Sequence, residues 1–418
     1  MSASYPTYKS TSIPWLPEMP EHWDLFPIRA VLEERGERND GVKTDYILSV
    51  LKDRGVVPYS EKGNVGNKMS ERIDNYKVVY PEDLVINKMN AIIGSLGMSK
   101  YYGALSQVYF VLKRRRPNDE PRFLSYLFQN KEFQPFLSTI SSGIMELRES
   151  IDKTKFNALK IPIPPPLEQT AIADYLDFRL EQINRFIAKK EKLIALLKEQ
   201  KQAVINELLE DKEDKWERRK LKYFCSLITK GTTPSTEGKE FTNSGVRFLK
   251  AENITENGLS ESPLFFIDEA TNQILKRSQL KANDILIVIV GATIGRTAII
   301  NENYLPANTN QAVCLLRLKK GVDPKFIRLL LSSPKIQERV RFDAVQSAQP
   351  NLSMGVLGDF LLPYPKSELE RQQLVKTIEE ESMRIDAVIQ RIAVEIEKVK
   401  ELKQSLIAEV VTGRIKVA

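Results

Sequence analysis

Two long segments of the chain carry apolar residues at alternating steps of four and three, which is the spacing of a coiled-coil helix. The first segment covers residues 167–209 and the second covers residues 369–411. Each follows a proline-containing motif, at 161–164 in the first case and 362–365 in the second. Because proline fixes φ and cannot continue a helix, each motif predicts an extended entry into the helix that follows. The pattern therefore predicts two long helices.

The apolar positions of the two predicted helices match one another at an offset of 202 residues, as Leu176 and Ile378 illustrate. A polar exception obeys the same rule, because Lys201 in the first helix matches Lys403 in the second. This offset is far longer than the repeats of solenoid proteins, so it indicates a duplication of whole domains. Two unrelated amphipathic helices would not be expected to share a register.

The segments before the two helices correspond as well. The segment that starts at Trp23 matches the one that starts at Trp216, and an Asp-led apolar strand at 83–86 matches one at 284–287. Gly94 matches Gly295 at the same offset of 201 as the strands. A chain of 418 residues is also too long for one core. We predict an α+β protein with the segments 1–166 (globular), 167–211 (helix), 212–366 (globular) and 367–418 (helix and C-terminal tail).

Charge and composition narrow the class of protein only slightly. The net charge of +7 favours an anionic partner without identifying one. Two cysteines, Cys225 and Cys314, give no disulfide framework, which is typical of a reducing compartment. The most apolar run, 285–290, is too short to cross a bilayer, and residues 1–20 are polar and proline-rich. We therefore expect a cytoplasmic protein without a membrane partner.

Motifs for catalysis or for cofactor binding are missing from the sequence. The segment 291–297 is similar to a phosphate-binding P-loop, but its glycines are one residue too close and Arg296 stands where lysine is needed. His22 is the only histidine, which excludes histidine triads elsewhere and paired-histidine metal sites. We find neither a glycine-rich fingerprint for S-adenosylmethionine nor an Asn/Asp-Pro-Pro-aromatic tetrapeptide. The sequence predicts a non-catalytic chain with no cofactor and no metal of its own.

Polar side chains gather beside glycine-rich turns in both globular segments. Arg, Lys, Asn and Gln make the contacts that distinguish base edges in DNA, while Lys, Ser, Thr and backbone amides anchor phosphates. Polar loops are also usual in any soluble domain, so polarity alone does not establish a contact with DNA. The candidate DNA-binding residues are Lys88, Asn90, Lys100, Tyr101, Tyr102, Gln107 and Arg148 in the first segment, and Lys230, Thr232, Thr233, Ser235, Lys250, Asn253, Arg296, Asn308, Asn310, Gln311, Gln349 and Asn351 in the second.

Several of these motifs resemble the target recognition domains of Type I restriction-modification DNA specificity (S) subunits. They are the loop 229–235 (Thr-Lys-Gly-Thr-Thr-Pro-Ser), the segments 245–250 and 290–296, and the run 310–312 (Asn-Gln-Ala). The segment 13–23 and the Pro-Leu-Glu-Gln motif that leads into the first helix resemble the same family. The resemblance covers essentially the whole chain, including its duplication. The first recognition domain departs from the pattern, because it lacks the Gly-Thr-Thr-Pro-Ser loop and the Asn-x-Asn-Gln run.

The resemblance implies a protein that reads DNA without changing it. Each target recognition domain would read one half of a bipartite site in double-stranded DNA. The helices would pack as an antiparallel coiled coil and set the non-specific spacer between the half-sites. Two modification (methyltransferase) subunits would dock on the chain and carry S-adenosylmethionine, and restriction (translocase and nuclease) subunits would join that core.

Two details follow from this mechanism. Arg148 occupies the slot of Gln349, and arginine favours guanine edges whereas glutamine favours adenine edges, so we expect the half-sites to differ. Inserting four residues near Glu199 is expected to change the spacer length while leaving both half-sites intact.

Two other function classes fit part of the pattern. A stand-alone DNA-binding regulator would bind without methylation partners and would dimerise to gain the symmetry that this duplicated chain already has. A coiled-coil scaffold would bind proteins, and it would have no salt-dependent affinity for DNA.

Overall fold

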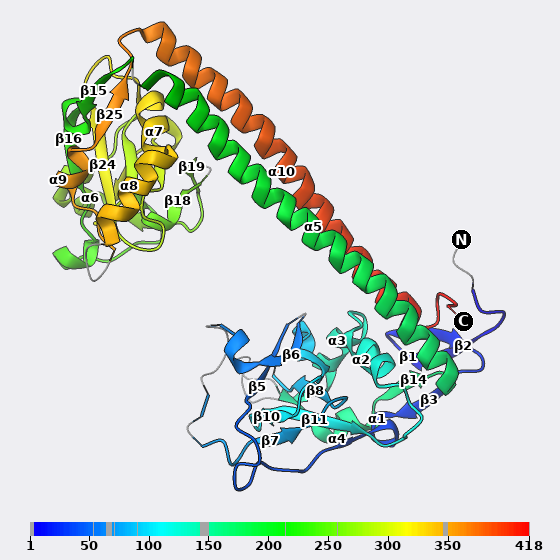
Figure 1. Cartoon of the computed structure of the whole chain (residues 1–418). Coiled ribbons are helices and arrows are strands. Elements are labelled where there is room, and N and C mark those ends of the chain that lie inside the picture. Colours follow the sequence, from blue (N-terminus) through cyan, green and yellow to red (C-terminus); the bar gives the residue numbers. More distant parts are fainter. Residues whose placement is uncertain are drawn as a thin grey trace. The chain divides into compact units, whose positions relative to one another are not determined.

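The computed structural model describes residues 4–52, 54–63, 69–70, 72–89, 91–142, 150–213, 215–256, 258–345 and 350–417. Contacts within the chain divide it into two compact units. Unit 1 comprises Met1–Glu191 together with Ala393–Ala418, and unit 2 comprises Lys192–Ile392. Each unit therefore contains one globular domain and a stretch of each long helix (Figure 1).

The domain of unit 1 is built around a four-stranded antiparallel sheet with the strand order β4-β11-β8-β9. Two-stranded pairs accompany it, namely β1–β2, β3–β14, β5–β6, β7–β10 and β12–β13. The strands are β1 (Tyr8–Ile13), β2 (Leu16–Pro20), β3 (Asp24–Pro27), β4 (Leu32–Glu34), β5 (Leu48–Leu51), β6 (Gly55–Pro58), β7 (Lys77–Val79), β8 (Leu84–Asn87), β9 (Leu96–Met98), β10 (Gly103–Leu105), β11 (Tyr109–Arg114), β12 (Ser141–Ser142), β13 (Ser150–Ile151) and β14 (Lys160–Ile163). The helices are α1 (Ile28–Val31), α2 (Pro121–Gln129), α3 (Phe133–Phe136), α4 (Lys153–Ala158) and the long α5 (Pro166–Glu213).

Unit 2 has the same plan, with a four-stranded antiparallel sheet in the order β16-β24-β21-β22. It also contains a three-stranded sheet, β20-β17-β23, and the pairs β15–β25 and β18–β19. The strands are β15 (Glu217–Lys220), β16 (Cys225–Lys230), β17 (Val246–Leu249), β18 (Ile254–Thr255), β19 (Gly258–Leu259), β20 (Phe266–Ile267), β21 (Ile285–Val288), β22 (Thr297–Ile299), β23 (Ala307–Thr309), β24 (Val313–Leu318) and β25 (Leu361–Tyr364). The helices are α6 (Glu269–Ile274), α7 (Pro324–Ser332), α8 (Pro334–Val345), α9 (Met354–Gly358) and the long α10 (Glu368–Val411).

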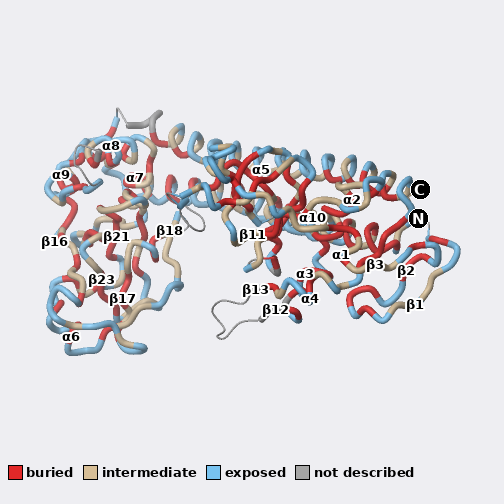
Figure 2. Tube along the Cα trace, turned by 90° about the horizontal axis from the view of Figure 1, so that it is seen from below, coloured by how far each residue is buried: buried red, intermediate tan, exposed pale blue. Residues whose placement is uncertain are grey.

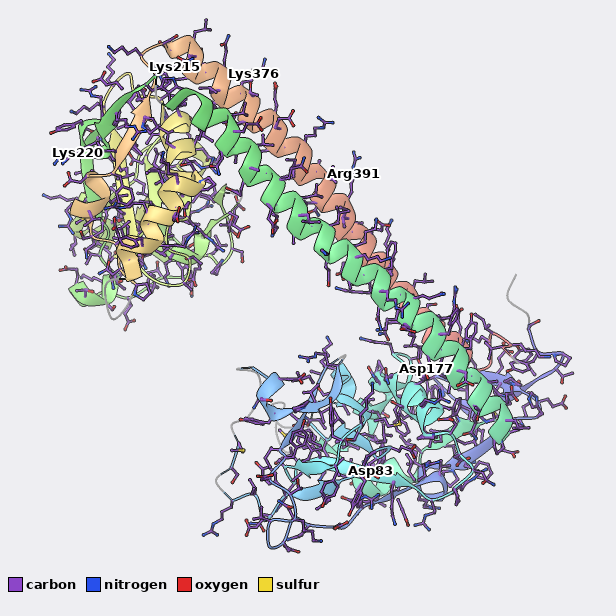
Figure 3. The ribbon with its side chains drawn as sticks, viewed as in Figure 1. Asp83, Asp177, Lys215, Lys220, Lys376 and Arg391 are labelled. Carbon is purple, nitrogen blue, oxygen red and sulfur yellow. The ribbon has the colours of Figure 1, made fainter. Side chains whose placement is uncertain are left out.

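A buried aspartate precedes a central strand in each sheet and confirms the predicted correspondence of the two domains. Asp83 and Asp284 each accept a hydrogen bond from the backbone amide three residues earlier, at 2.9 and 2.7 Å. Each carboxylate also binds an arginine at two points, Arg35 in unit 1 and Arg317 in unit 2, with N···O distances of 2.7–2.9 Å. Asp83 is labelled within its domain in Figure 3. The residue before each aspartate has a left-handed backbone, with φ of 69° and 67°.

The predicted match between Gly94 and Gly295 is confirmed by their backbone geometry. Their φ angles are +89° and +88°, a region that favours glycine. In each unit a glutamine amide occupies the space beside the glycine, so that an added Cβ would lie 3.3 Å from Gln134 Oε1 and 2.4 Å from Gln337 Oε1. Gln337 also donates to the Gly295 carbonyl at 2.8 Å. Both positions therefore favour glycine through their positive φ, and at Gly295 a side chain would also clash with Gln337.

One nine-residue helix in each unit, α2 or α7, packs beside the outer strand of the four-stranded sheet, β9 or β22. Both helices begin at a proline and are capped by the acidic side chain before it, Glu120 in unit 1 and Asp323 in unit 2. Phe123 and Phe326 are completely buried by this packing. Figure 2 shows buried positions along β17, β21 and β23, and mainly exposed ones along α6.

Each long helix is joined to its domain by a strand pair and a buried tryptophan. β3 pairs with β14 just before α5, and β15 pairs with β25 just before α10, which confirms the predicted extended entries. Trp23 Nε1 donates to Glu168 at 3.0 Å, and Trp216 Nε1 donates to Glu370 at 3.2 Å. The two glutamates lie in the first turns of α5 and α10, so the duplication extends to the junctions.

The helices α5 and α10 pack together in an antiparallel arrangement, as predicted. In unit 1 Lys403 donates to Asn184 at 2.9 Å, and in unit 2 Lys201 donates to Asp386 at 2.7 Å. The residue number rises along α5 as it falls along α10. These two contacts are equivalent under the 202-residue offset, because Asn184 matches Asp386 as Lys201 matches Lys403. The predicted apolar seam positions are buried or half-buried in both helices.

Candidate nucleic-acid interface

Candidate residues of unit 2 gather at one end of its four-stranded sheet. The strands β16 and β21 end there, and β22 and β24 begin there, because neighbouring strands run antiparallel. β16 ends with Lys230, the connection from β21 to β22 carries Arg296, and the segment before β24 carries Asn310 and Gln311. Three segments that are distant in the sequence therefore meet at this end.

A close backbone approach fixes two of these segments against each other. Gly231 donates its amide to the Asn310 carbonyl at 3.1 Å. A Cβ on Gly231 would lie 1.8 Å from the Thr309 carbonyl oxygen, so only glycine fits. The Thr233 amide donates to Gln311 Oε1 at 3.0 Å, and the Thr233 hydroxyl donates to the same oxygen. The Gly-Thr-Thr-Pro-Ser loop is thus held against the Asn-Gln run.

Arg296 and Asn351 lie at the edge of this group. The Arg296 guanidinium is 3.8 Å from the Glu256 carboxylate, and its side chain is 36% exposed. Asn351 forms a backbone bridge with Val290, which follows β21. Because the ion pair of Arg296 with Glu256 is long and screened by solvent, the Arg296 guanidinium is available to bind an anion or a guanine edge.

Lys250 lies in a small aromatic cage at the same end. It follows β17, which runs parallel to β23, so it lies next to the residues that follow β23. Its ammonium is 3.3 Å from the centre of the Phe265 ring and 4.4 Å from the centre of the Phe241 ring. The negative faces of both rings attract the cation and orient it. Phe241 is 39% exposed, so the cage opens to solvent. The two rings were missed in the sequence because nothing local links them to Lys250.

Two predicted DNA contacts of unit 2 are wrong as direct contacts, because Asn253 and Asn308 are buried. The Asn308 amide donates to Asn272 Oδ1 at 3.0 Å. Asn253 Oδ1 accepts the Lys250 amide at 3.0 Å, and Asn253 Nδ2 donates to the Pro263 carbonyl at 2.8 Å. Both side chains pair polar groups inside the fold, where unpaired ones are costly. The remaining described candidates form what we call the unit 2 loop surface: Lys230, Thr232, Thr233, Ser235, Lys250, Arg296, Asn310, Gln311 and Asn351.

The structure does not bring the candidates of unit 1 together. Lys88 follows the end of β8, and Gln107 precedes β11, so these two share one end of the sheet. Lys100, Tyr101 and Tyr102 follow β9, which is antiparallel to β8, and therefore lie at the opposite end. Sequence proximity does not reveal at which end of a strand a loop emerges, so the sequence alone could not assign these candidates to one surface.

The end of the unit 1 sheet that carries Lys88 also carries charged residues that the sequence analysis missed. Glu34, at the end of β4, forms an ion pair with Lys77, whose Nζ lies 2.7 Å from Glu34 Oε1, and it also pairs with Lys153. The Lys88 ammonium lies 4.7 Å from the centre of the Phe110 ring. Burial lowers the pKa of Lys88 below its ordinary value, and the charge of Lys77 lowers it further.

Asn90, Arg148 and Gln349 lie outside the described residues, so the proposed exchange of arginine for glutamine stays a prediction. Across the described ranges, no group of three or more His, Cys, Asp or Glu side chains could hold a metal ion. No described helix combines the length and apolarity needed to cross a membrane. Burial raises the pKa of Cys225 and of Cys314 to about 12, so both thiols stay protonated at neutral pH.

His22 belongs to a cavity of about 440 Å³ at the start of α5, lined also by Tyr5, Pro6, Pro165, Leu167, Glu168 and Lys416. His22 Nε2 lies 2.8 Å from Glu168 Oε2. The Tyr5 hydroxyl donates to the same carboxylate. The polar groups of this cavity thus serve the junction between domain and helix.

A family model described as the Type I restriction modification DNA specificity domain matches the chain twice, at residues 20–198 and 213–398. The Type I restriction enzyme EcoBI specificity subunit of Escherichia coli is 24% identical over 408 residues, which cover 91% of this chain and 82% of that protein. The MjaVIII specificity subunit of Methanocaldococcus jannaschii is 25% identical over 424 residues, covering 96% and 94%. A chain from a solved type I R-M system aligns with a TM-score of 0.67 at 15% identity, covering 94% of this chain and 98% of that one. This last likeness establishes the fold.

Proposed function

Since this chain belongs to the family of Type I restriction modification DNA specificity proteins and carries two copies of its domain, we propose that each domain reads one half of a bipartite DNA target. The chain performs no chemistry in this scheme. It selects the site at which partner subunits methylate or cleave.

The unit 2 loop surface is the observation that carries this proposal. It places Arg, Asn and Gln side chains, which recognise base edges, beside Lys, Thr and Ser side chains, which anchor phosphates. These groups come from separate loops that are fixed to one another by Gly231 and Gln311. A rigid polar surface of this composition is suited to reading several neighbouring base pairs.

The helix pair supports the second part of the proposal, which is a fixed spacer. α5 has 48 residues and is therefore about 72 Å long at about 1.5 Å per residue. That length exceeds one turn of DNA, about 34 Å. Cross-helix contacts such as Lys201 with Asp386 keep the two helices in register. The untouched base pairs between the half-sites would form the spacer.

The duplication supports two equivalent partners. Because the domain–helix junctions repeat at Glu168 and Glu370, the chain offers two similar docking regions to one kind of subunit. We propose that two modification subunits dock there, each carrying S-adenosylmethionine and methylating an adenine in one half-site. Flipping the adenine out of the stack would take place on those subunits. Restriction subunits would join this core in the cytoplasm.

Coexpression of the chain with its modification subunit, followed by methylome sequencing, tests the proposal. The expected result is one bipartite motif with a constant gap and methylated adenines in both halves. A continuous motif, or no new methylation in the presence of a folded complex, would contradict it. Binding of the complex to DNA should also weaken steeply as salt rises, which a protein-binding scaffold would not show.

A further inference from the structure

Two lysines from separate elements pair with one carboxylate in unit 1, and the charge of a third lysine interacts with this group. Lys77 opens β7, Lys88 follows β8 and Lys153 opens α4, and these elements lie together in the first domain (Figure 1). Lys77 Nζ is 2.7 Å from Glu34 Oε1, and Lys153 pairs with Glu34 Oε2. Lys77 also donates to the Tyr109 carbonyl at 2.8 Å, which fixes it at the start of β11.

The charges in this lysine cluster do not balance. Burial would raise the pKa of Glu34, but hydrogen bonds from Lys153 and Lys77 hold it below its ordinary value, so Glu34 is ionised at neutral pH. Within the part of the chain that the structure describes, the Lys88 ammonium makes no ion pair, and it lies 4.7 Å from the centre of the Phe110 ring. Among the described side chains of this cluster, three cations and one anion leave an excess of two positive charges at a half-buried position.

Such an excess is unfavourable for the free domain. Lys77 is only 16% exposed and Glu34 only 20%, so water screens their charges incompletely. Burial and the charge of Lys77 both oppose protonation of Lys88, and both lower its pKa. An ion pair that served stability alone would need one lysine for the one carboxylate. A bound anion would neutralise the excess.

We propose that Lys77, Lys88 and Lys153 form a phosphate-binding site through which the first recognition domain anchors the DNA backbone. Lysine ammonium groups act as point charges and suit a phosphodiester. Lysine can also contact a guanine edge, and comparing a target with a scrambled duplex separates these two roles. Glu34 has a positioning role, because its two oxygens hold Lys77 and Lys153 on either side. This site rests on the proposed function, since the phosphate belongs to the DNA target.

The location of the cluster agrees with this role. It lies where β8 ends and β11 begins, and the corresponding end of the unit 2 sheet, where β21 ends and β24 begins, carries the unit 2 loop surface. The position of Lys88 corresponds to that of Ile289. The Lys88 amide donates to the carbonyl of Val108, just before β11, and the Ile289 amide donates to the carbonyl of Ala312, just before β24. Ile289 is buried, so the two domains anchor DNA with different residues.

The test uses the full chain in complex with its modification subunit. Binding is measured by fluorescence anisotropy at several salt concentrations, with a labelled target duplex and a scrambled duplex of equal length. The variants are Lys88→Met and Lys153→Met, and the matched control is Lys113→Met, whose lysine pairs with Glu33 at 2.8 Å in the same sheet. Lys153 is 59% exposed, so its substitution is expected to leave the fold intact.

Each test variant should weaken binding to both duplexes by the same factor, about fivefold near 0.15 M salt, and lower the salt slope by about one. Lys113→Met should match the unaltered complex. If the two test variants also match it while the complex binds its target, the phosphate site is wrong and the proposed function stands. Loss on the target duplex alone would assign base reading to the lysines and overturn the site. An unaltered complex without affinity for DNA would refute the proposed function itself.

Discussion

Replacing Gly231 with alanine tests whether the unit 2 loop surface reads DNA. Gly231 does not have a positive φ, so the effect of a methyl group is purely steric. Its Cβ would lie 1.8 Å from the Thr309 carbonyl oxygen, whereas ordinary C···O contacts are about 3.3 Å or longer. The loop must therefore move by about 1.5 Å, which breaks the 3.1 Å hydrogen bond from Gly231 to Asn310 and displaces Thr233 from Gln311.

Three hydrogen bonds are lost, one from Gly231 to Asn310 and two from the amide and hydroxyl of Thr233 to Gln311. At about 1 kcal/mol each, Gly231→Ala should lower the free energy of unfolding of unit 2 by about 3 kcal/mol. A domain of ordinary stability remains folded after such a loss. Displacing the base-reading groups should cost a further 2 kcal/mol or so in binding, about 30-fold in Kd. The loss should be confined to DNA with an intact second half-site.

The assay compares anisotropy titrations on the target duplex with titrations on duplexes altered in one half-site, alongside thermal unfolding. Gly238→Ala is the matched control in the same loop, because Gly238 has a φ of +66° and no atom within 4 Å of its Cβ. The control should lose about 1 kcal/mol of stability to backbone strain and keep its DNA preference. If Gly231→Ala distinguished an altered second half-site as well as the control does, the loop surface would not be the reader.

Three further predictions concern the cage and the helices. Phe265→Leu should weaken binding of the target about fivefold without changing the slope of affinity against salt concentration. Lys250→Met should also lower that slope by about one. Salt-dependent titrations check this, and equal slopes for both variants would contradict it. Asp386→Ala should lower Tm by about 2 to 4 °C, because it leaves the Lys201 ammonium unpaired between the two helices, while Lys201→Met should raise Tm. Calorimetry measures both values. An unchanged Tm for Asp386→Ala would show that the ion pair does not stabilise the helix pair. One heptad inserted into α5 after Glu199, with a second at the opposing point of α10, lengthens the helix pair by about 10 Å. Methylome sequencing should then show a spacer longer by about three base pairs. Altered half-sites would contradict the prediction.

The frame of the molecule could be predicted from the sequence because its signals are periodic and repeated. Apolar spacing identified α5 and α10, and the motifs at 161–164 and 362–365 identified the strands that precede them. The shared offset also identified matching turns, such as those at Asp83 and Asp284. Strand order could not be obtained in this way, because the pairing of β4 with β11, or of β16 with β24, leaves no periodic signal.

The candidate site was predictable only where its residues stand in a distinctive local motif. The Gly-Thr-Thr-Pro-Ser loop and the Asn-Gln run are of this kind, and the structure places them together. Composition cannot separate an amide that faces solvent from one that pairs buried backbone groups, which is why Asn253 and Asn308 were misassigned. It also cannot reveal Lys77 and Lys153, which meet at Glu34 only because three elements converge on one end of a sheet.

The duplication itself explains which parts of the chain are equivalent and which are not. Residues that hold the frame, such as the tryptophan–glutamate pairs at the helix junctions, must satisfy the same geometry twice and so remain the same. Under the proposed function each domain contacts a different half of the target, so residues at the sheet ends face no such requirement. A lysine at position 88 and an isoleucine at position 289, each just after one of two matched strands, illustrate this freedom. If each domain reads its own half-site, the divergent surfaces are where specificity resides, and the frame shared by the two domains shows where on each domain to look for them.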